Sequence, residues 1–330
     1  MSAETEAIEE FDCFGSRCAA FVIGAGETGT AHDGALLAKR MLLFWHERFS
    51  RFIQSSELSM LNDDPRRQVP VGALMARFAQ AVHTAGSITG GLVDATLLAD
   101  IQLAGYTADL GEPLSLRRAL ALAGPRRPAS SSPHAGWRQI EVDLDALTVT
   151  RPPGVMLDSG GLAKGLFADV LGETLASHAS FAVNCAGDLL IGGAVGMTRE
   201  IRVESPFDGH IVHTFEYSAT GVATSGIGRR SWLGRDGRPA HHLLDPASGE
   251  PAFTGIVQVT ALAPSALMAE IRAKAALLNG PRAAAGWLTH GGVIVFDDGS
   301  YEVVQPPQVL TLKELSGFVQ RPASRALQDA

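Results

Sequence analysis

The stretch LDSGGLAKGLFADVLG, residues 157–172, joins a glycine-rich turn to an apolar helical run. Gly160, Gly161 and Lys164 stand where such a helix would begin. Glycines at a helix start leave backbone N–H groups free, and a lysine adds positive charge, so the combination suits an anionic ligand. Two interpretations stay open from this local pattern: a phosphate-binding loop, or a glycine turn that packs closely on a strand.

Two common nucleotide-binding loops do not fit the sequence. A Walker A loop requires G-x-x-x-x-G-K-[ST], but Lys164 precedes Gly165 and no hydroxyl follows the lysine. The stretch GAGETG at 24–29 is followed by residues that we interpret as a polar loop, whereas a dinucleotide fingerprint opens a helix. Hydrolysis of a nucleoside triphosphate is therefore not expected.

The periodicity on either side of this stretch predicts the fold class. Apolar residues at helical spacing predict helices over 33–52, 74–85, 162–175, 265–279 and 282–289. Strand patterns occur in RCAAFVIG, FAVNC, EIRVES, HTFEYS, VQVTALA, VIVFDD and YEVV. Because several of these strands follow one another without a helix between them, the prediction is an α+β fold with a mixed, mostly antiparallel sheet and flanking helices.

The same pass along the chain predicts its domain organisation. We expect a single domain over residues 12–304 and a loosely attached C-terminal tail over 305–330, where PP and RPAS interrupt any periodicity. The segment GPRRPASSSPHAG at 124–136 has the composition of a mobile linker. After it, WRQIEVDLDALTVTR has the alternation of a β-hairpin.

Composition excludes some classes of partner. The net charge of -8 argues against general nucleic-acid binding, which requires clustered Lys and Arg. No apolar run approaches the ~18 residues of a membrane span. The acidic start MSAETEAIEEFD has no apolar signal core, so the chain as written reads as cytoplasmic, or periplasmic if a leader was removed. Cys13, Cys18 and Cys185 are read as isolated reduced thiols.

A second concentrated motif is HHLLDPASGEP, residues 241–251. Asp245, Pro246 and Gly249 have the chemistry of a turn. Adjacent histidines project to opposite sides of an extended strand, so at most one of His241 and His242 can face a pocket. Whether that histidine is structural or catalytic stays open at this point.

Seven stretches taken in order resemble the successive motifs of the ApbE family of FAD:protein FMN transferases. They are RFSRFIQSSELSMLN, GGLVDATL, LDSGGLAKGLFAD, NCAGDLLIGG, VATSG, HHLLDPASGEP and VTALAPSALMAE. The resemblance implies that a threonine or serine hydroxyl of a target flavoprotein attacks the FAD pyrophosphate, taking FMN and releasing AMP. It also implies a divalent ion, usually Mg²⁺, that offsets charge on the phosphates. In this family the opening loop contacts FAD.

The resemblance implies roles for individual residues at the matching positions. Phe14 stands where the family usually has a methionine beside the flavin, and Phe52 where it usually has a tyrosine. His242 is the candidate base for the acceptor hydroxyl, with Asp158 as a second catalytic candidate. The implied FAD-contacting positions are Phe14, Phe52, Leu92, Val93, Asp94, Asp158, Lys164 and Leu244, and the implied metal positions are the Gly161 carbonyl, Glu270 and Lys274.

The metal positions depart from the family pattern. Glu270 stands in place of an Asp, and Lys274 in place of a Thr that ligates the metal, with Ala273 at the intervening position. An ammonium has three donors and no acceptor, so Lys274 cannot be a ligand. Either Lys274 pairs with Glu270 on a solvated face without functional weight, or its ammonium points into the site and takes the place of the metal.

Other departures agree with a diverged member. Ala186 replaces a usual glycine in NCAGD and is expected to crowd a ligand, while Gly228 and Arg229 replace a common aromatic and acid. The first functional hypothesis is therefore FMN transfer to a protein. The alternative is an FAD- or FMN-binding protein without transfer activity, in which Lys274 replaces the metal.

Overall fold

The computed structural model describes residues 5–107, 113–234 and 236–306, and its centre is one eight-stranded antiparallel sheet. The strand order is β1-β2-β6-β7-β10-β13-β14-β15. Every neighbouring pair is antiparallel, which confirms the predicted α+β class. The strands are β1 (Ala7–Cys13), β2 (Ser16–Ile23), β6 (Ser180–Cys185), β7 (Asp188–Gly192), β10 (Thr220–Gly226), β13 (Ile256–Ala263), β14 (Gly292–Phe296) and β15 (Tyr301–Val304).

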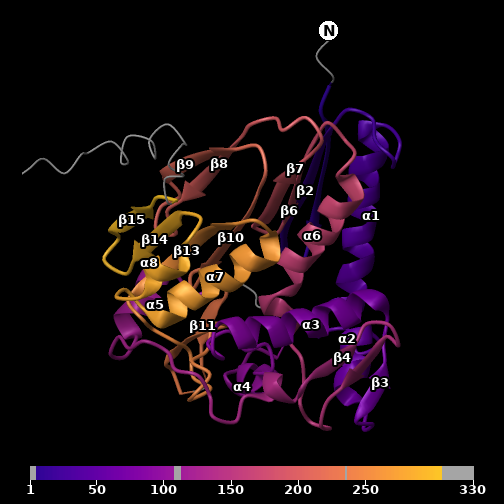
Figure 1. Ribbon diagram of the computed structural model, residues 1–330. Helices are drawn as coiled ribbons and strands as arrows, with labels where there is room; N and C mark the ends of the chain where they lie inside the picture. Colours follow the sequence, from indigo (N-terminus) through magenta and orange to yellow (C-terminus); the bar gives the residue numbers. More distant parts are fainter. Residues whose placement is uncertain (1–4, 108–112, 235, 307–330) are drawn as a thin grey trace, which may run out of the picture.

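Three long helices cover one face of this sheet. They are α1 (Ala31–Phe49) over β1 and β2, α6 (Ala163–Leu175) over β6 and β7, and α7 (Ala266–Asn279) over β10 and β13 (Figure 1). A two-stranded ribbon, β8 (Arg199–Glu204) and β9 (Ile211–Tyr217), packs its apolar side chains with those of the opposite face. The central strands β10 and β13 are therefore almost fully buried, whereas the edge strands β1 and β15 keep exposed residues.

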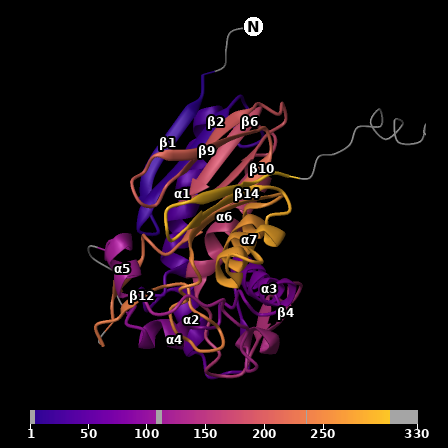
Figure 2. The same ribbon diagram turned by 90° about the vertical axis from the view of Figure 1, so that its left-hand side faces the viewer.

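A second group of helices and short strands forms the other end of the molecule (Figure 2). A three-stranded sheet of β3 (Gln68–Pro70), β5 (Thr148–Thr150) and β4 (Glu141–Asp143) contains the predicted hairpin. Around it lie α2 (Glu57–Asp63), α3 (Ala73–Ile88) and α4 (Leu98–Leu103). The remaining elements are α5 (Leu116–Leu122), η1 (Gly136–Gln139), η2 (Ser159–Gly161), β11 (Ser231–Leu233), β12 (Pro239–His241) and α8 (Ala284–Trp287).

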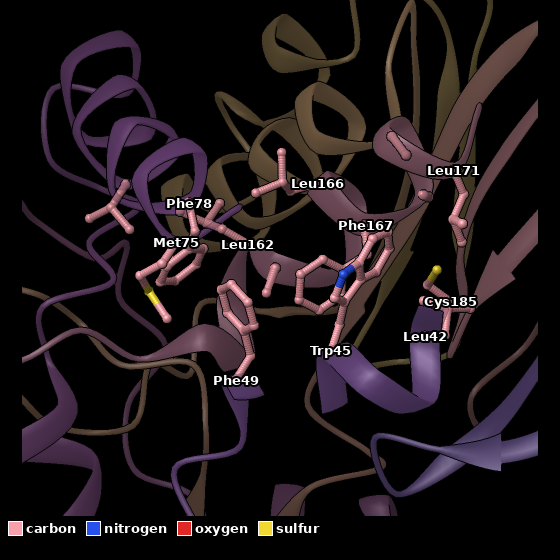
Figure 3. Packing of buried hydrophobic residues seen from close by; sticks show 14 of the residues in the cluster. Leu42, Trp45, Phe49, Met75, Phe78, Leu162, Leu166, Phe167, Leu171 and Cys185 are labelled. Atoms are coloured by element: carbon pink, nitrogen blue, oxygen red, sulfur yellow. The ribbon is translucent and has the colours of Figure 1, made fainter. Parts of the chain in front are cut away.

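An aromatic cluster links the helices of the two ends (Figure 3). The ring of Phe49 meets those of Phe78 and Phe167 edge-on, with centroids 5.7 Å and 5.0 Å away. The ring of Trp45 is tilted against that of Phe167, with centroids 5.2 Å apart. Since these side chains come from α1, α3 and α6, their burial fixes the end of α1 against the start of α6.

The crossing of α6 and α7 explains one glycine of the opening stretch. A Cβ at Gly165 would lie 2.7 Å from the Cα of Leu267, so only glycine permits this close approach. The Asp169 carboxylate accepts the backbone N–H groups of Ala266 and Leu267 at 2.7 Å and 3.1 Å and holds the start of α7. Gly165 therefore serves packing, against a helix rather than the strand suggested by one interpretation of the sequence.

The structure departs from three expectations about segments. Helix α1 begins directly after GAGETG, so the predicted polar loop is wrong. Gly26 in this stretch packs closely on buried His178, since a Cβ at position 26 would lie 2.8 Å from the imidazole. The segment 124–136 is not a mobile linker: Arg127, Ala129 and Ser130 donate backbone hydrogen bonds to Phe253, Leu278 and Asp245. Strand β1 begins before the predicted boundary at residue 12. Most of the predicted tail lies outside the described residues.

Candidate functional site

A cavity of about 560 Å³ opens where α1, α6 and α7 meet the loops of the other end. Its size lies in the range of cofactor pockets. Four groups of residues line it: the tip of the β1–β2 hairpin, the end of α1 with residues 50–53, the start of α6, and one side of α7. Further lining comes from loop residues 92–97, from Arg229 and Arg230, and from 242–244.

The cavity has two separate aromatic groups. At one, Phe14 stacks on Phe167 at 5.6 Å and meets His46 edge-on at 5.1 Å. At the other, Tyr106 lies 5.6 Å from Phe52 and 5.3 Å from Trp232. The cavity thus offers apolar ring contacts at two places.

Arg51 lies in the second aromatic group and was missed from the sequence. Its guanidinium carbon is 4.5 Å and 4.4 Å from the centroids of Phe52 and Tyr106. Its Nη1 donates to the Tyr106 carbonyl at 2.9 Å, and its Nε lies 3.6 Å from the Asp158 carboxylate. Nη2 is buried and has no hydrogen-bond partner among the described residues. A buried guanidinium nitrogen beside a cavity is a donor available to a ligand.

For FAD, the ligand that the sequence resemblance implies, we expect Arg51→Met to raise the Kd about 10-fold, because it removes a charged donor and the support of Asp158. Titration of the apoprotein with FAD, followed by flavin fluorescence, measures this. Arg48→Met is the matched control, since Arg48 pairs with Glu57 and does not line the cavity. Equal affinity of Arg51→Met and the wild type would show that Nη2 has no ligand contact.

The start of α6 supplies groups suited to an anion. Gly160, Gly161, Ala163 and Lys164 all line the cavity, and the helix begins at Ala163. The Asp158 carboxylate accepts the Gly160 N–H at 3.2 Å, which holds the loop in shape. A helix N-terminus carries partial positive charge, which is compatible with the anion-binding interpretation of this stretch, and that interpretation stays a prediction.

Behind Lys164 is a buried cluster of four charges. The Lys164 ammonium lies 2.5 Å from Asp188 and 3.9 Å from Glu270, and the Lys274 ammonium donates to Glu270 at 2.9 Å. Burial lowers the pKa of Lys164, but the carboxylates of Asp188 and Glu270 outweigh this and raise it. Lys164 therefore stays protonated at neutral pH. The four charges balance, but only the two ammonium side chains line the cavity, whereas Asp188 and Glu270 are buried behind them.

His242 lines the cavity, and His241 does not, as the alternation predicted. The Nδ1 of His242 lies 3.5 Å from the Arg230 carbonyl, which assigns its hydrogen to that side and leaves Nε2 with a lone pair. Burial, then the charges of Arg230, His241 and Lys274, lower its pKa well below the usual value. His241 is buried against Phe253, and burial lowers its pKa to about 3.

Asp94 ends the glycine turn at 90–91 and also lines the cavity. Its Oδ1 accepts from the backbone and hydroxyl of Thr96 at 2.8 Å and 2.5 Å. Oδ2 is buried without a hydrogen-bond partner in the described part of the chain, and burial raises the pKa of the carboxyl. The carboxyl group thus has an unsatisfied oxygen beside the cavity, where a polar ligand atom would satisfy it.

The structure brings together the residues that the resemblance selected. All but one of them line this single cavity: Phe14, Phe52, Leu92, Val93, Asp94, Asp158, Gly161, Lys164, His242, Leu244 and Lys274. Glu270 is the exception, because it is fully buried behind the wall. Asp158 contacts Arg51 and Gly160, which favours a positioning role over a direct catalytic one.

The residues at the implied metal positions do not fit Mg²⁺. The Glu270 carboxylate already accepts from Lys274 and from the Gly165 N–H, the latter at 3.0 Å. Magnesium requires a nearly octahedral set of oxygen ligands, and an ammonium among them offers none. Within the described ranges, no three His, Cys, Asp or Glu side chains are grouped so that they could hold a metal ion.

Three further expectations can be compared with the structure. Ala186 does not line the cavity, so it does not crowd a ligand there. It lies in the β6–β7 turn with a φ of 56°, a left-handed conformation that favours glycine. The three cysteines are free thiols, as predicted, and all three are buried. None of the helices in the described ranges has the length and hydropathy of a membrane-spanning segment.

Comparison with known proteins assigns the family. The ApbE family model matches residues 30–296, most of the chain. The chain belongs to the ApbE family. Two solved structures share the ApbE fold: the ApbE protein of Thermotoga maritima (22% identity, TM-score 0.72, covering 96% of this chain and 100% of that one) and the apo flavinyl transferase of Pseudomonas stutzeri (20%, 0.73, 93% and 96%).

Curated ApbE relatives are named FAD:protein FMN transferase. That of Salmonella typhimurium is 26% identical over 212 residues, 61% of this chain and 58% of its own length. That of Treponema pallidum is 30% identical over 141 residues, 38% and 39% of the two chains. The matches to the first three curated relatives span 58–66% of those proteins, so their activity comes to this chain only as a proposal.

Sequence reasoning did not select several residues that line the ApbE-type cavity, among them His46, Arg51, Tyr106 and Arg230. A signal existed for Arg51, since a charged residue stands directly beside Phe52 in a stretch that already resembled a family motif. His46 follows Trp45 of the predicted core stripe, but helical periodicity alone does not indicate that the His46 side chain faces a cavity. Tyr106 and Arg230 reach the site only through tertiary packing.

Proposed function

We propose that this chain transfers FMN from FAD to a threonine or serine hydroxyl of a partner flavoprotein and releases AMP. The observation that carries the proposal is the juxtaposition of a neutral histidine and a cationic wall in one cavity. His242 has a free imidazole nitrogen, and the N-terminus of α6, Lys164 and Lys274 line the same space. The names of the relatives support the same reaction.

The two aromatic groups of the cavity suit the two ring systems of FAD. The group around Phe14 and the group around Phe52 and Arg51 provide stacking and cation–π contacts. A dinucleotide held at both ends places its pyrophosphate between them, where Lys164 and the backbone of Gly160 and Gly161 line the cavity. The unsatisfied Asp94 oxygen supplies one further polar contact.

The chemical step requires a base and positive charge. His242 Nε2 accepts the proton of the acceptor hydroxyl while its oxygen forms a bond to the phosphorus on the FMN side. The bond from that phosphorus to the bridging oxygen breaks, and AMP leaves with that oxygen. Preorganised donors along α6 and the lysines stabilise the charge that develops on the phosphate oxygens.

The magnesium ion implied by the resemblance would supply charge at the same place. Because Gly161, Glu270 and Lys274 do not provide a ligand set for it, no step above depends on a metal. One specific observation favours a second function: an ammonium at a family ligand position is compatible with a protein that binds FAD or FMN and does not transfer it. The proposed single domain over 12–304 stays a prediction in either case.

Mass spectrometry distinguishes the two functions. The full chain is incubated with FAD and a synthetic peptide that carries a flavinylation-type threonine, with and without Mg²⁺. A peptide mass increased by one FMN, with equimolar AMP, supports transfer. The same peptide with valine in place of that threonine is the control and should stay unmodified. FAD binding without any modified peptide, repeated with a peptide that a known family member modifies, would support the non-catalytic function.

A further inference from the structure

The Glu270–Lys274 pair of the charged cluster is buried, unlike an ordinary ion pair on a helix surface. Glu270 is fully buried and Lys274 is 8% exposed, so the pair does not lie on a solvated face as one interpretation of the sequence held. Helix α7 is buried almost all round because it packs on β10 and β13, on α6 and on α8. A buried ion pair costs desolvation energy, which makes it a poor device for stability alone.

The Lys274 side chain reaches the α6 loop. Its Cε lies 3.5 Å from the point that a Cβ on Gly161 would occupy, which is ordinary van der Waals distance, so the lysine packs directly against this loop. Lys274 also lines the cavity, and its charge is among the causes of the lowered His242 pKa. The ammonium is therefore held between Glu270, the Gly161 loop and the cavity, among the positions that the family resemblance gives to a metal.

The charge balance of the cavity shows a second, independent adjustment. Arg229 lines the cavity at a position where the resemblance gives an acid, and Arg230 beside it donates to the Phe14 carbonyl at 3.2 Å. Loss of a divalent ion removes two positive charges from such a site. Lys274 returns one positive charge. Arg229 in place of an acid changes the charge by two more, from −1 to +1, so the site remains suited to a diphosphate.

We propose that the Lys274 ammonium is a built-in cation for the diphosphate of FAD, so that this protein binds FAD without a divalent metal ion. The inference rests on the proposed function, since it names how the same cavity holds its dinucleotide. Glu270 orients the ammonium from behind by accepting one of its three hydrogens at 2.9 Å. The other two are available to phosphate oxygens and to the Gly161 loop.

FAD titration of the full chain, followed by flavin fluorescence in excess Mg²⁺ or in EDTA, tests the inference. For the wild type we expect the two Kd values to agree within about 2-fold. Lys274→Met should raise Kd roughly 10-fold or more in both buffers, because a charge-assisted contact is lost and Mg²⁺ cannot replace it. Lys274→Thr, which restores a hydroxyl ligand, should bind weakly in EDTA and recover in Mg²⁺.

Two further variants keep the test independent of folding. Lys274→Met/Glu270→Gln removes both charges and avoids a buried unpaired carboxylate, so its Kd should match that of Lys274→Met. Arg272→Met, on the same helix but outside the cavity, is the control for charge and should bind as the wild type does.

Two results would overturn the inference: a wild-type Kd that rises 10-fold or more in EDTA, or a Lys274→Met variant that folds and binds FAD with unchanged affinity. A different failure belongs to the proposed function. If the folded wild type does not bind FAD in either buffer, the assignment of the cavity to a flavin dinucleotide is wrong, and the inference falls with it.

Discussion

Lys164→Met is expected to lower the free energy of unfolding by about 3–5 kcal/mol, because it leaves the Asp188 carboxylate buried and unpaired. Asp188 is 1% exposed, and Lys164 at 2.5 Å is its one ion-pair partner among the described residues. Urea denaturation followed by circular dichroism measures the loss. A decrease below about 1 kcal/mol would indicate that water reaches the pair and screens it.

The double variant Lys164→Met/Asp188→Asn separates stability from binding. It removes both charges and should recover most of the lost stability, since no buried ion is left without a partner. Its Kd for FAD should still be about 10-fold or more above that of the wild type, because the ammonium beside the α6 N-terminus is gone. Wild-type affinity in this stable variant would exclude a contact between Lys164 and the diphosphate.

The fold class followed from the sequence because its signals are local. Long helical stripes, as in Leu37 to Phe49, and consecutive alternating runs require only neighbouring residues to be recognised. Edge strand β1 was missed because its charged, alternating residues, AIEEFDC, resemble an acidic tail until they pair with β2. Segment 124–136 looked like a linker because its hydrogen bonds go to Asp245, Phe253 and Leu278, far along the chain.

The candidate site was predictable where residue type and motif coincide. Asp158, Lys164 and His242 stand in dense motifs, and all three line the cavity. For Lys274 two interpretations stayed open from the sequence, because an i, i+4 Glu–Lys pair on a helix is ordinarily solvated. Only the packing of α6 against α7, through Gly165 and Asp169, shows that the pair is enclosed.

The cationic surroundings that suit a diphosphate also determine the state of the proposed base. The charges of Arg230 and Lys274 act after burial to lower the His242 pKa, so the imidazole is neutral at pH 7 and remains neutral below pH 6.5. A neutral imidazole can accept a proton, whereas an imidazolium cannot. The cationic residues proposed to suit the diphosphate would thus also keep the proposed base unprotonated.

His242→Ala is expected to lower the FMN transfer rate by about 10²–10⁴-fold while FAD affinity changes less than about 3-fold. Single-turnover transfer to the threonine peptide at saturating FAD gives the rate, and fluorescence titration gives the affinity. The adjacent substitution His241→Ala is unsuitable as a control because His241 is fully buried in the core. His242→Asn keeps a polar group of similar size without an imidazole base and should lose as much transfer as His242→Ala.

The pH profile gives a readout that a merely structural role of His242 would not change. Protonation of the base stops transfer, and because the folded-state pKa lies below 6.5, the wild-type rate should stay level from pH 8 through pH 6.5 and fall only at lower pH. In His242→Ala the residual rate should lack this acidic limb. An acidic limb centred at or above pH 6.5 in the wild type would contradict a buried neutral imidazole. A His242→Ala rate within 10-fold of the wild type would exclude His242 as the base and leave the acceptor proton to another group.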